Sequence, residues 1–180
     1  GYTPQVLSNL ILHKLDENKA ALADAEFGLF TTPLLTDPIG TAVSDQEGKI
    51  EFNDLRLGTY YLAETKAPEG YACLEDAIKI ELKRESREEG FKLIVDGKTY
   101  GEDDTQNIWF EPVDADRQDV HIRVENQRSV TVSYAFGIGE HPAVQLPADS
   151  IIAKGTTGFK PEMPKEAAGY IFKGWYYEQN

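Results

Sequence analysis

The chain has 180 residues, of which 41% are hydrophobic and 27% are charged, values that are normal for a globular protein. Its formal net charge of −13 argues against nucleic acid as a partner, which requires a basic surface, and disfavours docking on anionic lipid. No run approaches the ~18 consecutive apolar residues of a membrane-spanning helix, so no membrane insertion is expected.

Cysteine and acidic residues give no sign of a metal or a cofactor. Cys73 is the single cysteine, so an internal disulfide is excluded and no Cys/His cluster has zinc-ligand spacing. The acid-rich stretches 96–104 and 114–119 do not fit a calcium loop. We therefore expect neither metal nor cofactor, and the fold must gain its robustness without disulfides.

Turn signals separate short apolar or alternating runs at intervals of about ten residues, which is typical of an all-β sandwich. Asp45–Gly48 predicts a type I turn, and Asp96-Gly97 predicts a tight hairpin. The predicted strands are 5–14, 26–31, 42–44, 49–52, 58–66, 77–81, 92–95, 107–110, 119–126 and 130–136.

Two features divide the chain. The stretch 83–118 is polar, and we interpret it as an irregular insertion between two core strands. Near residues 127–129 the composition changes toward Pro, Gly and aromatic residues. We therefore predict a sandwich domain at 1–128, with the insertion at about 83–118, and a small β-rich domain at 129–180.

Three polar residues share a strand face with apolar residues. Side chains alternate between faces along a strand, and Lys14, Glu64 and Asn126 each fall in phase with the apolar residues of their own predicted strand. Those apolar residues are Leu10 and Leu12, Tyr60 and Leu62, and Val120, Ile122 and Val124, respectively. Since a buried unpaired charge is costly, we expect the three polar groups to meet.

Strand phase alone leaves two other interpretations open. Each of the three residues lies near a strand end, where its side chain can curl out to water. The intermediate interpretation is a Lys14–Glu64 salt bridge with Asn126 as a hydrogen-bonded neighbour. The three histidines, His13, His121 and His141, are expected to lie far apart and to be structural.

Residues 52–71 resemble the motif of Cna B-type (SpaA-like) domains, the Ig-like sandwich modules of Gram-positive pilins and adhesins. The motif comprises an aromatic residue, Leu, Gly-Thr-Tyr, Glu and Ala-Pro-x-Gly-Tyr. Leu12–Asp16 resembles the first-strand lysine motif of that family, Ala25–Phe30 its second strand and Val124–Gln127 its closing strand. The resemblance spans residues 6–127 in the family's order.

The resemblance implies a spontaneous isopeptide bond between Lys14 and Asn126, with Glu64 as the catalytic group. Burial lowers the pKa of a lysine toward its nucleophilic neutral form. The implied role of Glu64 is to hydrogen-bond the carboxamide oxygen of Asn126, polarise its carbon and shuttle protons. Lys14 then displaces ammonia in a single turnover, so the protein is not expected to be an enzyme.

The C-terminal segment is similar to small β repeats of bacterial surface proteins, which end their core in Gly-Tyr-x-Phe-x-Gly-Trp. Gly169–Trp175 carries this pattern, and such repeats continue past the Trp, which predicts an incomplete repeat here. The aromatic side chains near it either pack in a core or form a sugar platform. They are Tyr170, Phe172, Trp175, Tyr176 and Tyr177.

Two functions follow from these expectations. The first is a stalk or pilin-like module of a cell-wall-anchored, extracellular Gram-positive surface protein, whose partners are neighbouring domains of the same protein. The alternative is an adhesin domain that binds a host matrix protein or glycan through the 83–118 stretch or the C-terminal aromatic residues. No nucleophile motif, phosphate loop or paired-carboxylate arrangement favours an enzyme.

Overall fold

The structure is a computed structural model that describes residues 1–101 and 106–176. Within these residues it contains twelve β-strands in three sheets and no helix, so no helix could cross a membrane there. The prediction of an all-β fold is confirmed. The chain divides into two compact units, Gly1–Arg128 and Ser129–Asn180.

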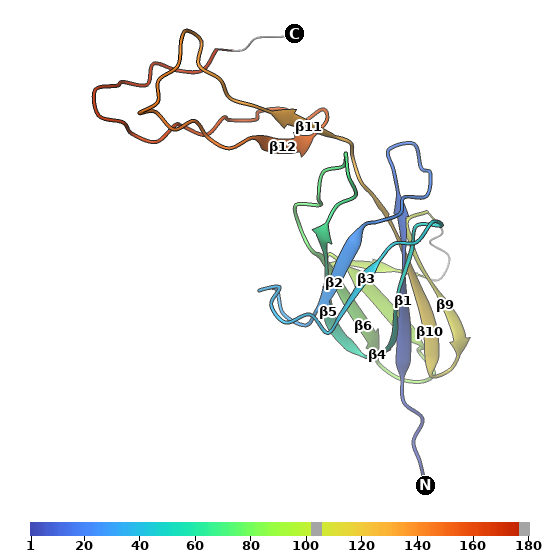
Figure 1. The fold of residues 1–180 in the computed structure, drawn as a ribbon. Coiled ribbons are helices and arrows are strands. Elements are labelled where there is room, and N and C mark those ends of the chain that lie inside the picture. The colour runs from blue at the N-terminus through green and yellow to red at the C-terminus, as the bar shows by residue number, and fades with distance from the viewer. Residues whose placement is uncertain (102–105, 177–180) are drawn as a thin grey trace. The chain divides into compact units, whose positions relative to one another are not determined.

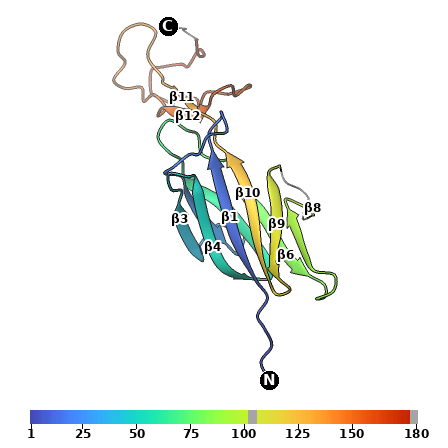
Figure 2. The same ribbon diagram turned by 90° about the vertical axis from the view of Figure 1, so that its right-hand side faces the viewer.

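One sheet of the first unit has four strands in the order β4-β1-β10-β9 (Figure 2). Their bounds are Lys49–Arg56 for β4, Leu7–Leu15 for β1, Arg117–Glu125 for β10 and Ile108–Asp114 for β9. β1 runs antiparallel to β4 and parallel to β10, and its parallel register runs from Leu7 opposite Arg117 to Leu15 opposite Glu125. The first and last strands of the unit therefore lie side by side along their whole length.

The second sheet has six antiparallel strands in the order β3-β2-β5-β6-β7-β8, and Figure 1 shows β2, β5 and β6 next to one another. Their bounds are Gly40–Val43 for β3, Glu26–Phe30 for β2, Gly58–Lys66 for β5, Ile78–Arg84 for β6, Phe91–Val95 for β7 and Lys98–Tyr100 for β8. Asp96 and Gly97 connect β7 to β8 with φ of 48° and 82°, as a tight two-residue hairpin requires. The predicted hairpin is confirmed.

The core lies between the two sheets and is built from the apolar phase of their strands. Leu10, Leu12 and Ile122 enter it from the four-stranded sheet, and Phe27 and Leu62 enter it from the six-stranded sheet. Leu12, Phe27 and Leu62 are completely buried. The period-two alternation that predicted these strands is therefore the pattern that builds the sandwich.

The turn before β4 lies directly against the end of β1. Gly48 donates its amide to the Asp45 carbonyl at 2.9 Å, and its own carbonyl accepts the amide of Lys14 at 2.7 Å. A Cβ at Gly48 would lie 2.3 Å from the Lys14 carbonyl oxygen, and the φ of this residue is +75°. Only glycine fits there, so the predicted turn also fixes the backbone of Lys14.

The stretch 83–118 is not irregular, and that expectation is wrong for its described residues. It supplies the end of β6, all of β7, β8 and β9, and the start of β10. Leu93, Val95 and Phe110 from this stretch are buried in the core. The predicted strands 92–95 and 107–110 correspond to β7 and β9, whereas the polar composition of the whole stretch wrongly suggested an irregular insertion. Residues 102–105 lie outside the described part.

The second unit has one two-stranded antiparallel sheet among its described residues. β11 (Ser129–Val132) pairs with β12 (Ser150–Ala153), which was not predicted. Gly169–Trp175 forms no strand. The half-buried Trp175 ring packs against Tyr134 and Phe172 with centroid distances of 4.9 and 5.1 Å, and Phe172 stays 38% exposed. Tyr177, part of the expected sugar platform, lies outside the described residues.

Leu12→Ala should lower the free energy of unfolding by about 2–5 kcal/mol, because it leaves a cavity in a completely buried position. Leu34→Ala is the matched control, since Leu34 is 79% exposed, and it should change stability by less than about 0.5 kcal/mol. Urea unfolding followed by tryptophan fluorescence measures both. Equal effects of the two changes would contradict the described core.

Candidate functional site: a buried lysine, glutamate and asparagine

The three predicted site residues come from three different places in the fold. Lys14 is the penultimate residue of β1, Glu64 lies in β5 of the opposite sheet, and Asn126 directly follows β10. The parallel pairing of β1 with β10 brings Lys14 and Asn126 to the same end of the sheet, and the Asn126 amide donates to the Leu15 carbonyl at 2.9 Å. Lys14 and Asn126 are completely buried, and Glu64 is 8% exposed.

The structure brings the three side chains into contact. The Lys14 Nζ atom donates a hydrogen bond to Asn126 Oδ1. It also lies 3.9 Å from Glu64 Oε2. The Asn126 Nδ2 atom donates to both Glu64 carboxylate oxygens, at 3.0 and 2.9 Å. The surface interpretation does not describe this arrangement, because all three side chains are buried. A Lys14–Glu64 pair with Asn126 as a hydrogen-bonded neighbour is consistent with the contacts.

Burial lowers the pKa of Lys14 from 10.5 to about 8, although the nearby Glu64 carboxylate opposes that shift. The cause is desolvation, since an ammonium inside an apolar core has lost its water. The Phe27 ring lies 5.5 Å from Nζ and forms part of the apolar surroundings. About a tenth of Lys14 is therefore neutral and nucleophilic at pH 7, far more than for a lysine of ordinary pKa.

Glu64 contacts a different atom of Asn126 from the one expected. The resemblance implies a hydrogen bond from Glu64 to the carboxamide oxygen, whereas the structure places both Glu64 oxygens on the carboxamide nitrogen. The physical reason is that a carboxylate accepts hydrogen bonds and Nδ2 carries the donors, while Oδ1 is occupied by the Lys14 ammonium. Glu64 thus contacts the nitrogen that would leave as ammonia if Lys14 attacked the carboxamide.

The segment after the Ala-Pro-Glu-Gly-Tyr motif supplies two further contacts that the sequence did not predict. The Ala72 carbonyl accepts a hydrogen bond from Asn126 Nδ2 at 3.3 Å. The Leu74 amide donates to Glu64 Oε1 at 2.9 Å. Both contacts are made by backbone groups, which nearly every residue type carries, so residue types could not predict them. The one available signal was the turn at Gly70, with φ of +84°, which folds this segment back over the site.

The site has the parts needed to convert a carboxamide into a secondary amide. An amine of lowered pKa contacts the carboxamide, and a carboxylate lies between the attacking and leaving nitrogens. Fixed contact between reactants can contribute on the order of 7–11 kcal/mol toward lowering a barrier. Among the described residues no group of three His, Cys, Asp or Glu side chains could hold a metal ion.

Two of the histidines are neighbours, and the expectation that all three lie far apart is wrong for them. His13 Nε2 and His121 Nδ1 are 2.9 Å apart, and the His121 ring stacks on Trp109 with a centroid distance of 4.7 Å. The parallel pairing of β1 with β10 places them on the outer face of the four-stranded sheet. Burial lowers the pKa of both imidazoles, which favours their neutral forms.

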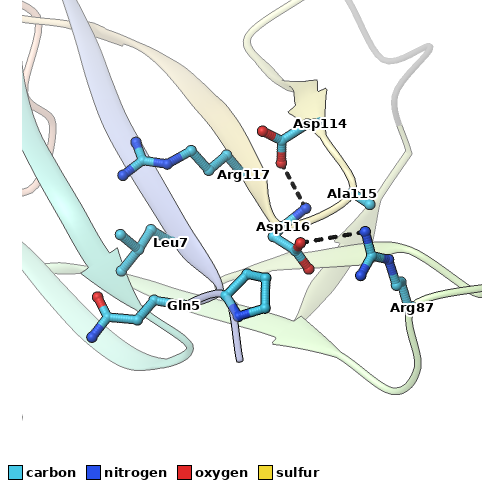
Figure 3. Close-up of a pocket in the computed structure, with 8 residues that line it drawn as sticks. Gln5, Leu7, Arg87, Asp114, Ala115, Asp116 and Arg117 are labelled. Atoms are coloured by element: carbon cyan, nitrogen blue, oxygen red, sulfur yellow. Dashed lines mark hydrogen bonds and ion pairs between the residues drawn. The ribbon is translucent and has the colours of Figure 1, made fainter. Parts of the chain in front are cut away.

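A separate pocket of 540 Å³ opens beside Leu7 at the start of β1, at the opposite end of that strand from Lys14 (Figure 3). Arg87 and the β9–β10 turn, residues 114–117, line it. Arg87 forms an ion pair with Asp116 at 3.5 Å, and Arg84 forms a second one at 2.9 Å. The charges of the pocket are therefore largely compensated within the chain.

Residues 8–95 match the family model of SpaA, a prealbumin-like fold domain. The match covers just under half of the chain, includes Lys14 and Glu64, and ends before Asn126. It does not extend to residues 129–180, so the C-terminal repeat stays a prediction. No match was found among curated proteins.

Solved structures similar to the chain include the group B streptococcus pilus 2b backbone protein, with 25% identity and a TM-score of 0.44 over 67% of this chain and 40% of that one. The major pilin subunit BcpA of Bacillus cereus has 22% identity and a TM-score of 0.46 over 69% and 30%. A C-terminal fragment of the pilus adhesin SpaC from Lactobacillus rhamnosus GG has 21% identity and a TM-score of 0.45 over 68% and 46%. The chain spans less than half of each of these proteins.

The lowered pKa of Lys14 predicts a pH dependence of stability in a variant that lacks the Asn126 carboxamide. In Asn126→Leu the unfolded state binds the Lys14 proton between pH 8 and 10.5, whereas the folded state has released it. The free energy of unfolding should therefore rise across this window, by about 2–3 kcal/mol. The double variant Lys14→Met/Asn126→Leu should lack this rise in urea unfolding. The same pH profile in both variants would contradict the assigned shift.

Proposed function

We propose that the chain is a non-enzymatic structural module of an extracellular, cell-wall-anchored Gram-positive surface protein, of the stalk or pilin kind. Its sandwich is crosslinked by an isopeptide bond between Lys14 and Asn126 that forms with the help of Glu64. The observation that carries the proposal is the contact of these three side chains inside the core. The SpaA match over residues 8–95 and the order of the Cna B-type motifs support it.

The proposed reaction balances within the three residues. The neutral Lys14 amine attacks Asn126 Cγ, a bond forms between Nζ and Cγ, and the bond from Cγ to Nδ2 breaks. One proton moves from Nζ to Nδ2, which leaves as ammonia. Glu64 carries that proton, because its carboxylate lies 3.9 Å from Nζ and 2.9 Å from Nδ2.

The position of the bond suits a module under tension. β1 and β10 are parallel, so the chain enters the first unit at one end of the four-stranded sheet and leaves at the other. A bond from Lys14 to Asn126 transmits force from β1 directly to the chain that leaves the unit. The intervening chain, across a sequence separation of 112, is then not extended by that force. By analogy with a disulfide, closing a loop of this length contributes about 4–5 kcal/mol. An amide also resists reduction, in a chain whose single cysteine, Cys73, is unpaired.

The alternative function, adhesin-like binding of a host protein or glycan, has one feature in its favour. The 540 Å³ pocket is lined largely by residues of the 83–118 stretch, the segment expected to contact such a ligand. Its arginine and aspartate side chains pair with one another, which leaves little uncompensated charge for a ligand. The structural role therefore has the stronger support, with neighbouring domains of the same protein as partners.

The bond removes one ammonia, so the intact mass of the folded protein should be about 17 Da below that of the sequence. Lys14→Met and Asn126→Leu should each restore the full mass, because each removes one reactant. Glu64→Gln should fold and keep the full mass, since it preserves shape but cannot carry the proton. Arg87→Ala, remote from the site, is the control and should retain the loss. A wild-type mass equal to that of the sequence refutes the crosslink.

A further inference from the structure

The segment that covers the site is held in place by side chains that take no part in the proposed reaction. Arg128 donates from Nε to Glu17 Oε1 at 2.7 Å, and its guanidinium lies 5.0 Å from the centroid of the Tyr71 ring. The backbones of Tyr71 and Arg128 also form an isolated antiparallel bridge. We call Glu17, Tyr71 and Arg128 the outer cluster. It joins the β1–β2 connection, the loop after β5 and the chain that leaves β10.

The outer cluster acts on the loop whose backbone contacts the reacting groups. The Ala72 amide, next to Tyr71, donates to the Gln127 carbonyl at 2.9 Å, and the Ala72 carbonyl accepts from Asn126 Nδ2 at 3.3 Å. Two residues further on, the Leu74 amide donates to Glu64 Oε1 at 2.9 Å. The loop thus contacts both the leaving nitrogen and the proton carrier.

We propose that Arg128 is a positioning residue for isopeptide formation: by joining Glu17 to Tyr71 it closes the 67–74 loop over Lys14, Glu64 and Asn126 and excludes water from them. The inference rests on the proposed function and adds a role for a residue two positions beyond the reactive asparagine. Arg128 touches neither reactant, so its effect passes through the loop.

A positioning role and a surface ion pair predict different consequences. The Arg128 side chain is 55% exposed and that of Glu17 27% exposed, so their ion pair contributes little to global stability. A reaction between fixed groups is far more sensitive, because a displacement of about 1 Å can slow it on the order of a hundredfold. Removal of Arg128 should therefore slow the bond much more than it weakens the fold.

Water exclusion gives a second, independent consequence. Desolvation is the largest cause of the lowered pKa of Lys14. If the outer cluster keeps the site dry, opening the loop rehydrates the amine and returns its pKa toward 10.5. The pH at which the reaction reaches half of its maximal rate should then move upward in a variant that lacks Arg128.

The experiment follows bond formation during cell-free synthesis of the full chain. Aliquots are quenched in acidic guanidinium chloride, and the fraction that has lost about 17 Da is measured by mass spectrometry. Arg128→Ala should slow the reaction on the order of tenfold or more and raise its pH midpoint above the value of about 8 expected for wild type. Arg128→Lys, which keeps the charge beside Glu17, should recover part of the rate. Arg87→Ala is the matched control and should behave as wild type.

The outcomes separate the inference from the proposed function. If wild type loses ammonia and Arg128→Ala does so at the same rate and pH midpoint, the positioning role is overturned and the crosslink stands. A slower reaction with an unchanged pH midpoint also overturns it if Arg128→Ala lowers the free energy of unfolding, measured in urea in the Asn126→Leu background, by as much as it raises the barrier of the reaction. That result shows general destabilisation. If wild type loses no ammonia at any pH, the proposed function fails and the inference fails with it.

Discussion

Burial of the Lys14 amine is the constraint around which one end of the sandwich is organised. A lysine ammonium without water is costly inside an apolar core unless it finds charge or hydrogen-bond partners. The structure supplies Asn126 from the adjacent parallel strand and Glu64 from the opposite sheet. Gly48, in the turn before β4, fixes the Lys14 backbone. It lies so close to the Lys14 carbonyl that no residue with a Cβ would fit. Three other parts of the chain thus contact Lys14, two at its side-chain amine and one at its backbone.

The sheet topology explains why this residue set lies at this end. Parallel pairing of β1 with β10 puts their C-terminal ends together, so a lysine near the end of one strand meets an asparagine just after the other. In the proposed stalk module, the same pairing would make β1 and β10 the strands that carry tension through the unit. The proposed covalent link at that point would spare the hydrogen bonds between them from bearing the load alone. The proposed chemistry and the proposed mechanical role would then depend on the same strand pair.

Much of the first unit could be predicted from local sequence. Period-two alternation found most of its strands, and strand phase indicated that Lys14, Glu64 and Asn126 face inward. It could not show which atoms meet, because the orientation of the Asn126 carboxamide depends on the partners that surround it. The contacts of Ala72 and Leu74 are made by backbone groups and leave no trace in composition. The pairing of His13 with His121 depends on a parallel register between strands that are more than one hundred residues apart.

The 83–118 stretch shows the limit of composition as a guide. Its charged residues lie on outer faces and its connections, while Leu93 and Val95 alternate beneath them in β7. Local alternation did predict strands at 92–95 and 107–110, but the surrounding charges favoured the interpretation of the whole stretch as an irregular insertion. The same limit applies to the second unit, where β12 has no completely buried residue and was missed.

The most direct test of the central claim is tryptic peptide mapping of the folded wild-type protein. An isopeptide at Lys14 blocks cleavage after that residue, so the digest should contain one branched peptide in which residues 1–19 are joined to residues 124–128 with loss of ammonia. Fragmentation should place the link between Lys14 and Asn126. Separate linear peptides 1–14, 15–19 and 124–128, each at its full sequence mass, would contradict the account.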